Sequence, residues 1–574
     1  MKSSAGRKTG YLILSAVIFL IAALVLTANR TLAQESISNA NGQVGASSQS
    51  LSLSGSVGIY GELYDKSRGI DRRPSSSARL FFRPTLSIYK SFSISTNMIL
   101  STEGNSNRQN INQIDFNPRW QWGYAHAGDF TDTYSSLTLN GIRIRGGGVS
   151  INPGTFRLAA VVGQTRRATS NTSSNRSFSR SLYGGKIGIG KQGGSFIDLI
   201  VLKSRDKSSS LPDLQDSSIA SDTTVADSVI NPWSIFPADN FITAIASNLK
   251  MFNKKVTWAN EISGCAYTRN TEGKKLTNED IPSWVDKVFK VRIGSRVDVG
   301  YKTDLSYASK KWSFSSGYDF IGPGYISLGL SSLMSDRQAI RLGCTYRQKN
   351  WTAAINGIRE NDNLIDQKIF TTVRQRVSGI LNLRPTKWWN VVFTTSLLTM
   401  NNDAKNDTSL IDNTNALFGI NQIFTPVGHR KIQSLSLNVV SQRSNDTNPL
   451  RDNADLKSYS ADFRMTIEAT SYLSLTPALG LASTKIGTEK SKTITTIILN
   501  AQHKALAERL STNITLGPSF SSDANTFRVI LMSSYKLTRV DQIQTELKLN
   551  KFNSDSTEPD YNETIWNLSF THKF

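Results

Sequence analysis

The sequence predicts an all-β fold, a transmembrane antiparallel β-barrel of about 26 strands, with about 24 as the alternative. Three observations predict it. Apolar and polar residues alternate along most of residues 51–574, the connections between these stretches alternate between short and long, and no long apolar run follows Leu26. In a lipid bilayer only helices and closed barrels satisfy every backbone hydrogen bond. We therefore expect residues 51–574 to form one barrel without a separate plug domain.

The alternation of apolar and polar residues is clear in the last predicted strand. Neighbouring side chains of a strand point to opposite faces. One face of this strand carries Trp566, Leu568, Phe570, His572 and Phe574, and the other carries polar residues. A final strand of this kind resembles the C-terminal signal of bacterial outer-membrane β-barrels, although His572 stands where an aromatic residue is usual. The resemblance implies that these five residues form the barrel-assembly signal and that the barrel-folding machinery and outer-membrane lipid are partners.

The N-terminal residues predict export. A positively charged start is followed by an apolar run at residues 11–26, and small residues then precede a cleavage site between Ala33 and Gln34. The apolar run is shorter than the ~20 residues that a membrane-spanning helix needs. We expect residues 1–33 to be a signal peptide, residues 34–50 to be a short polar periplasmic segment, and the protein to reside in the cell outer membrane.

The net charge restricts the partners. The chain carries a formal charge of +22, of which four basic residues of the signal peptide contribute +4 and leave +18 for the rest. A basic protein can bind nucleic acid, but an exported chain rarely meets its own cell's nucleic acid. The charge instead indicates anionic lipid head groups or an anion-lined lumen, and we expect no nucleic-acid partner.

The connections fall into two alternating kinds. Short turns are predicted at residues 89–91, 153–154, 191–194, 253–255, 309–311, 349–350, 384–387, 425–429, 470–472, 504–508 and 538–541. Longer polar connections are predicted at residues 65–77, 102–115, 166–180, 204–240, 269–290, 322–337, 401–409 and 444–457. Outer-membrane barrels keep short turns on the periplasmic side and long loops on the other side.

If both ends of the barrel are periplasmic, the number of strands must be even. An even number requires two strands between residues 134 and 152. A turn at Asn140-Gly141, a favoured hairpin dipeptide, would divide this stretch and place every later short turn on the periplasmic side. This division gives the count of 26. If one predicted hairpin is instead a loop, the count falls to 24.

Two glycine motifs resemble nucleotide-binding loops but lie in the wrong context. Residues 188–193 read G-x-G-x-x-G and residues 185–191 read G-x-x-x-x-G-K. Both motifs require a helix after the loop, whereas strand-like residues flank these glycines, so we predict a hairpin. The four histidines are far apart in the sequence and none has a metal-ligand spacing. We predict no enzymatic activity, no cofactor and no metal.

Two blocks carry a further resemblance. Residues 111–165 contain Asn117-Pro118-Arg119-Trp120 and a triple glycine at 146–148, and residues 318–329 read YDFIGPGYISLG. Both blocks resemble poorly characterised large outer-membrane barrels of Bacteroidetes and Chlorobi bacteria. The resemblance implies location and fold and supplies no catalytic residue.

Within the first block, Arg143, Arg145 and Arg157 are candidates to line the lumen. The longest loop, residues 204–240, holds six aspartates and either folds inward against lumen arginines or lies outside the barrel. Cys265 and Cys344 fit no metal pattern, and the sequence leaves open whether they form a disulfide.

These features predict a passive channel or export conduit that favours anions. Barrels of more than about 18 strands leave a channel or hold a plug. The alternative is a non-conducting scaffold that anchors surface or secretion-machinery partners through its long loops, with a protein partner filling the lumen. A TonB-driven transporter is disfavoured, because we identify no N-terminal plug in the sequence.

Overall fold

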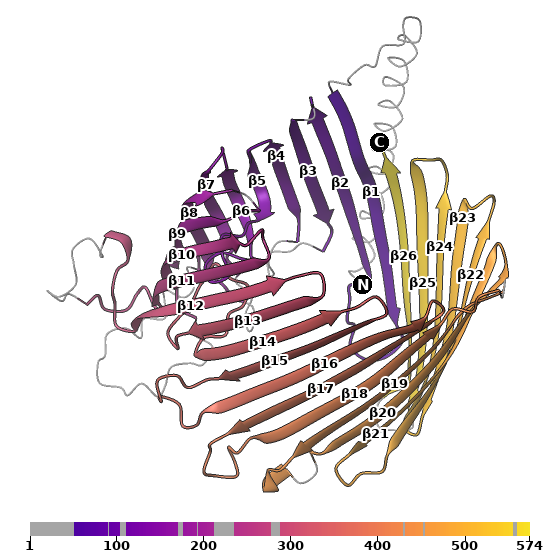
Figure 1. Cartoon of the computed structure of the whole chain (residues 1–574). Helices are drawn as coiled ribbons and strands as arrows, with labels where there is room; N and C mark the ends of the chain where they lie inside the picture. Colours follow the sequence, from indigo (N-terminus) through magenta and orange to yellow (C-terminus); the bar gives the residue numbers. More distant parts are fainter. Residues whose placement is uncertain are drawn as a thin grey trace, which may run out of the picture. The chain divides into compact units, whose positions relative to one another are not determined.

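A computed structural model describes residues 51–574 except residues 90, 104–110, 170–175, 192, 212–234, 277–286, 429–430, 452–453 and 555–558. The predicted signal peptide, the cleavage site and segment 34–50 lie outside the described residues. No helix in the described ranges is long and apolar enough to cross a membrane. The described part is mostly β-strand (Figure 1).

The first thirteen strands are β1 (Leu51–Lys66), β2 (Ser76–Ile88), β3 (Phe92–Ser101), β4 (Gln113–Trp120), β5 (Gly123–Thr131), β6 (Arg143–Ile151), β7 (Phe156–Arg166), β8 (Ser179–Gly190), β9 (Phe196–Lys207), β10 (Asp239–Met251), β11 (Val256–Thr268), β12 (Ser295–Ala308) and β13 (Trp312–Ile321). The other strands are β14 (Arg337–Arg347), β15 (Trp351–Asn361), β16 (Thr372–Thr386), β17 (Trp389–Asn402), β18 (Asp412–Phe424), β19 (Ile432–Asp446), β20 (Leu456–Thr470), β21 (Leu473–Ile486), β22 (Lys492–Ala505), β23 (Leu510–Ser521), β24 (Ala524–Lys536), β25 (Asp541–Ser554) and β26 (Tyr561–Lys573). Two 3₁₀ turns, η1 (Ser208–Ser210) and η4 (Pro449–Arg451), follow β9 and β19.

The 26 strands form one closed antiparallel sheet. Each strand pairs with the next in sequence, and β26 returns to pair with β1 (Figure 1). At this seam the backbone N–H of Gly55 donates to the carbonyl oxygen of Phe574 at 2.8 Å, and the N–H of Phe574 donates back at 3.2 Å. Closure removes the unpaired edges that an open sheet would expose. The predicted fold class and the count of 26 are confirmed.

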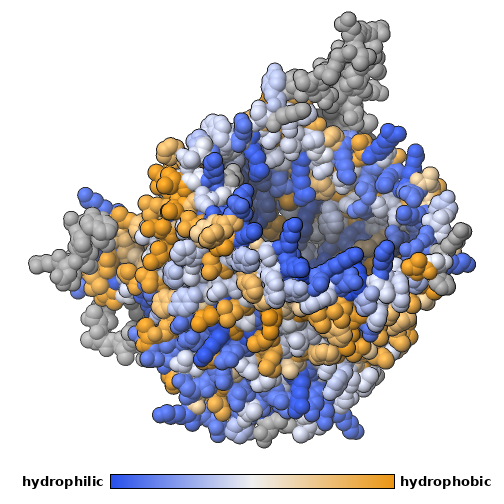
Figure 2. Space-filling model, viewed as in Figure 1, coloured by the Kyte–Doolittle hydropathy of each residue, from blue (hydrophilic) through white to orange (hydrophobic). Residues whose placement is uncertain are grey.

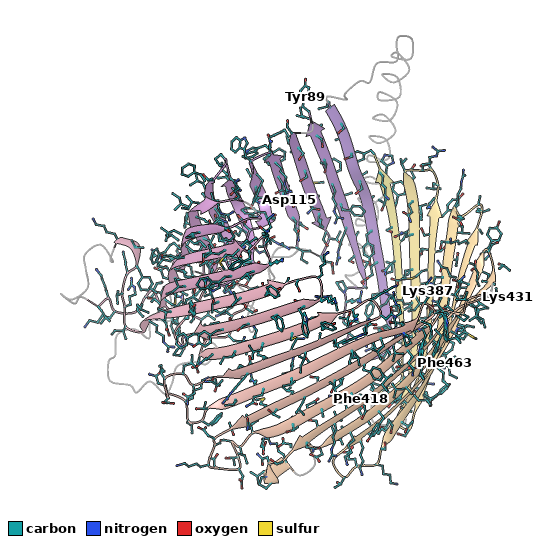
Figure 3. All side chains as sticks on the ribbon, in the orientation of Figure 1. Tyr89, Asp115, Lys387, Phe418, Lys431 and Phe463 are labelled. Atoms are coloured by element: carbon teal, nitrogen blue, oxygen red, sulfur yellow. The ribbon has the colours of Figure 1, made fainter. Side chains whose placement is uncertain are left out.

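All the predicted short turns lie between consecutive strands at one end of the barrel, which we call the short-turn rim. Tyr89 and Lys387, labelled in Figure 3, lie in two of these turns, and Lys431 follows the turn predicted at residues 425–429. The predicted long connections lie at the other end, the long-loop rim. The glycine motifs at residues 185–193 lie in the hairpin of β8 and β9, so a strand and not a helix follows them, as predicted.

The two faces of the sheet differ in chemistry. Exposed apolar side chains such as Phe418 and Phe463, 49% and 45% exposed, lie on one face and polar side chains on the other (Figure 3). We call the apolar face the outer face and the opposite face the lumenal face. Figure 2 shows a deep hollow bordered mainly by hydrophilic residues, while hydrophobic residues gather on the flanks. This chemistry is the reverse of a soluble barrel, whose apolar residues fill the interior.

The predicted hairpin at Asn140-Gly141 is wrong in position. Strand β5 ends at Thr131 and β6 begins at Arg143, so residues 132–142 are not strands. Thr131 and Arg143 pair directly, which leaves these eleven residues as a loop that departs from the wall. The number of strands is nevertheless 26. The additional strand comes from the hairpin of β4 and β5, which a tight turn at residues 121–122 connects, and not from a hairpin at Asn140-Gly141.

Candidate functional site: the lumen

Two segments, residues 132–142 and 322–336, fold onto the lumenal face of the barrel, and we call them together the lumenal shelf. Asn140 of the first segment forms a parallel bridge with Leu330 of the second. Leu137 and Tyr325 are fully buried in the main apolar cluster, against wall residues such as Ile200 and Ile242. The cluster joins the shelf to strands β5–β11 and β13.

Wall glycines make room for the shelf. A side chain at Gly300 of β12 would come within 3.1 Å of the Leu137 side chain and 3.3 Å of the Tyr325 ring. Gly184 of β8 would likewise meet a ring atom of Tyr134 at 3.4 Å. Strand glycines often mark the close approach of another segment. The shelf is therefore built into the wall of the barrel.

Glu261 of β11 holds the first shelf segment. Its carboxylate accepts hydrogen bonds from the backbone N–H groups of Ser136 (3.1 Å) and Leu137 (2.9 Å) and from the Ser136 hydroxyl (2.7 Å). Glu261 is only 6% exposed. A buried carboxylate needs such donors, because an unpaired buried charge is costly.

Tyr325 and Asn240 connect the second shelf segment to the first segment and to the wall. The Tyr325 hydroxyl donates to the carbonyl oxygen of Leu137 at 2.9 Å and lies 2.7 Å from the Ser263 hydroxyl of β11. Burial raises the pKa of the Tyr325 hydroxyl, which therefore stays a proton donor at physiological pH. The Asn240 amide of β10 accepts from the N–H of Leu328 at 2.9 Å.

Replacing Glu261 with Leu should destabilise the barrel while leaving its strands intact. Two backbone N–H groups and one hydroxyl would lose an ionised acceptor, and hydrogen bonds to charged groups are worth about 1.5–3 kcal/mol each. We expect the temperature at which the folded, heat-modifiable band disappears in detergent to fall clearly. Glu508→Leu, at a side chain 66% exposed in a short turn, is the matched control. Equal unfolding temperatures for the two variants would contradict the anchoring role.

The three arginines predicted to line the lumen do not share one face. Arg143 and Arg145 flank Ile144, which is fully buried in the cluster beneath the shelf, so both lie on the outer face of β6. Arg145 pairs there with Asp129 at 2.8 Å. Arg157 shares a face of β7 with the cluster residues and is lumenal.

Arg157 does not carry an isolated lumenal charge. Its guanidinium donates to both carboxylate oxygens of Asp198 of β9, at 2.7 and 2.9 Å. The Arg157 side chain is 11% exposed and that of Asp198 is 2% exposed. The pair therefore contributes little net charge to the lumen.

Other arginines are exposed on the lumenal face. Arg376, Arg464 and Arg528 lie on β16, β20 and β24 and are all exposed. Each is the strand neighbour of an exposed apolar residue of the outer face: Val377, Phe463 and Phe527 respectively. Alternation therefore turns the three guanidinium groups toward the lumen.

Four arginines surround a pocket of about 220 Å³ at the long-loop rim, which we call the arginine pocket. The pocket is lined by Arg166, Arg176, Ser177, Phe178, Arg180, Asp206, Ile235, Phe236, Ala238, Tyr267 and Arg269. Arg180 donates to both oxygens of Asp206, at 2.7 and 2.9 Å, and so neutralises the one carboxylate of the lining. The remaining arginines give the pocket an excess of positive charge.

A β-bulge directs Arg166 into this pocket. The register of β7 and β8 shifts between Gln164 and Arg166, so that Arg166 lies directly opposite Arg180. Arg180 shares its strand face with the fully buried cluster residue Leu182, which makes that face lumenal. Bulges commonly redirect a side chain next to a functional site. Arg166 therefore lies beside the ion pair of Arg180 and Asp206.

The predicted assembly residues divide into two groups. Trp566, Leu568 and Phe570 are exposed on the outer face of β26. His572 is only 4% exposed, and its Nδ1 lies 2.6 Å from a carboxylate oxygen of Asp541. The His572 ring stacks on that of Phe574, with ring centroids 6.1 Å apart.

Cys265 and Cys344 are both free thiols. No group of three or more metal-ligating side chains occurs among the residues that the structure describes. Most of the acidic loop, including Asp213, Asp216 and Asp222, lies outside the described residues.

Comparison with solved structures finds outer-membrane barrels at low identity. The translocation pore of the P pilus usher PapC matches at 7% identity and a TM-score of 0.36, over 91% of this chain and 100% of that one. The siderophore receptor PirA of Pseudomonas aeruginosa matches at 9% identity and 0.39, over 91% and 80%. An anion-selective porin from Comamonas acidovorans matches at 9% identity and 0.24, over 48% and 93%. Such values give no basis for transferring a function.

No family model matches the chain, and no curated protein matches it either.

Proposed function

We propose that the protein is a passive outer-membrane channel or export conduit that favours anions and uses neither cofactor nor catalysis. The observation that carries the proposal is the reversal of chemistry across the closed wall, which is apolar on the outer face and polar on the lumenal face. An exposed apolar face of this extent requires lipid around it, and a polar face requires water. A large barrel of this kind leaves room for a conducting lumen.

The preference for anions rests on the lumenal charges. Arg376, Arg464 and Arg528 are exposed on the lumenal face, and the arginine pocket adds positive charge at the long-loop rim. Rings of basic side chains favour anions in membrane pores. The outer-membrane location, export by residues 1–33 and a kinship with Bacteroidetes and Chlorobi barrels belong to the same proposal.

Charge reversal tests this selectivity. The triple variant Arg376→Glu, Arg464→Glu and Arg528→Glu should move the reversal potential under a salt gradient toward cation preference, with the anion-to-cation permeability ratio falling roughly severalfold. The matched control is Arg143→Glu with Arg145→Glu, because these two arginines lie on the outer face. The control should leave the reversal potential near that of the unmodified protein. A shift of equal size in both variants would contradict the assignment of faces.

The second candidate function is a scaffold that binds surface or secretion-machinery partners. The observation in its favour is the lumenal shelf, which already occupies part of the interior. A scaffold whose lumen is filled by a partner and by loops should not conduct. Single-channel recording therefore separates the two candidates.

A further inference from the structure

Three basic residues form a row on the outer face at the long-loop rim. Arg443 of β19 pairs with Lys457 of β20, and Lys457 pairs with Lys485 of β21. All three side chains are exposed. Adjacent strands lie about 4.8 Å apart, so the three positive charges lie side by side across the sheet. We call Arg443, Lys457 and Lys485 the basic row.

The basic row lies on the outer face and not on the lumenal face. On β20, Lys457 shares its strand face with Tyr459 and Phe463, which are 58% and 45% exposed. Arg443 shares the face of Val439 on β19 and Lys485 that of Leu481 on β21, by the same alternation. The row therefore continues the apolar outer face toward the long-loop rim.

Within β19, β20 and β21, the described outer-face positions carry apolar or neutral polar residues besides the basic row, and none of them is acidic. The Arg443 guanidinium donates to the Asn445 side chain at 2.9 Å, a neutral partner. Like charges directly opposite one another on a sheet destabilise it. The arrangement costs stability unless an anion lies over it.

The layers below the row indicate what kind of anion this is. Ser441, Tyr459 and Ser483 pair with one another in the next outer-face row and present three hydroxyl groups. Below the hydroxyls the outer face becomes apolar, with Phe463 between Leu437 and Leu479. A column that is cationic, then hydroxylic, then apolar matches the phosphate, the polar head group and the acyl chains of one lipid.

We propose that the basic row binds the phosphate group of a phosphorylated lipid in the leaflet at the long-loop rim. Lysine and arginine pair strongly with phosphate oxygens, and basic residues near a membrane surface are attracted to anionic lipid. Tyr459, in the row of hydroxyl groups next to the basic row, would then lie at the membrane interface, where aromatic residues are common in outer-membrane barrels. The apolar rows beneath the charges favour a lipid over a free phosphate ion, because only a lipid covers both.

Binding of diphosphorylated lipid A by the delipidated protein in detergent tests the proposal. The triple variant Arg443→Ser, Lys457→Ser and Lys485→Ser should bind lipid A about a hundredfold more weakly than the unmodified protein. The control Arg376→Ser, Arg464→Ser and Arg528→Ser removes the same charge from the lumenal face and should bind as the unmodified protein does. Lys457→Arg with Lys485→Arg should retain binding. Heat-modifiable migration verifies that each variant is folded.

Two ligand controls identify the source of the phosphate. Dephosphorylated lipid A should bind weakly to the unmodified protein, and inorganic phosphate at millimolar concentration should not displace the diphosphorylated lipid. Equal binding of the phosphorylated and dephosphorylated lipids would overturn the proposal. So would equal binding by the triple variant and the unmodified protein, or full displacement by inorganic phosphate.

Discussion

Replacing Phe570 and Phe574 with Ser should nearly abolish insertion of the barrel into the outer membrane. Phe570 belongs to the exposed apolar face of β26, and the backbone of Phe574 closes the seam with Gly55. Each phenylalanine moved from water into an apolar environment is worth roughly 1.5–3 kcal/mol. The same change also removes the pattern that resembles the assembly signal. We expect the amount of folded, heat-modifiable protein in the outer membrane to fall about tenfold or more.

The control for this loss is Phe418→Ser with Phe463→Ser. Both phenylalanines lie on the outer face within the wall, so the control loses similar contact with lipid but leaves the final strand intact (Figure 3). We expect the control to reach the outer membrane in clearly larger amounts. Similar yields for the two double variants would mean that β26 has no special role in assembly.

Removing the first shelf segment should increase the conductance of the channel. Thr131 and Arg143 pair directly, so a short glycine-serine turn can replace residues 132–142 and still join β5 to β6 in their present register. The change deletes Leu137 and its contacts with Tyr325, and the second shelf segment loses its main partner. If the shelf narrows the lumen, the lumen should widen in this variant. We expect the single-channel conductance to rise roughly twofold.

The matched control removes residues 68–74 from the connection between β1 and β2. These residues are all exposed and lie at the same rim. The control should leave the conductance unchanged within the spread of single channels. An unchanged conductance in the shelf variant as well would show that the shelf does not limit the pore.

The wall of the barrel could be predicted from the sequence because its signals are local. The short turn at residues 349–350 lies between two stretches with alternating apolar residues, and the structure places it between β14 and β15. The even strand count followed from the alternation of short and long connections. These features depend on neighbouring residues, which a single sequence displays directly.

The shelf could not be predicted in this way. Leu137 and Leu139 alternate with polar residues as in a strand, and both are fully buried in the interior cluster. This alternation indicates that the two leucine side chains are buried. It does not indicate that the barrel wall is the surface that buries them. The nearest signal is Glu261, the single charged residue of β11.

The arginine pocket escaped prediction for a different reason. The sequence predicts Arg166 and Arg180 at the two ends of a long polar connection, which leaves their mutual position undefined. The bulge after Gln164 reverses the alternation of β7 and turns Arg166 toward Arg180. A single inserted residue moves the following side chains to the opposite face of a strand. No pattern in the sequence predicts this bulge.

Single-channel recording of the purified protein in a planar bilayer tests the proposed channel most directly. An anion-favouring channel should give discrete conducting steps and, under a salt gradient, a reversal potential on the anion-favouring side. It should also give larger steps once residues 132–142 are replaced by a short turn. Folded, heat-modifiable protein that conducts neither with the shelf nor without it would contradict the channel and leave the scaffold as the remaining candidate.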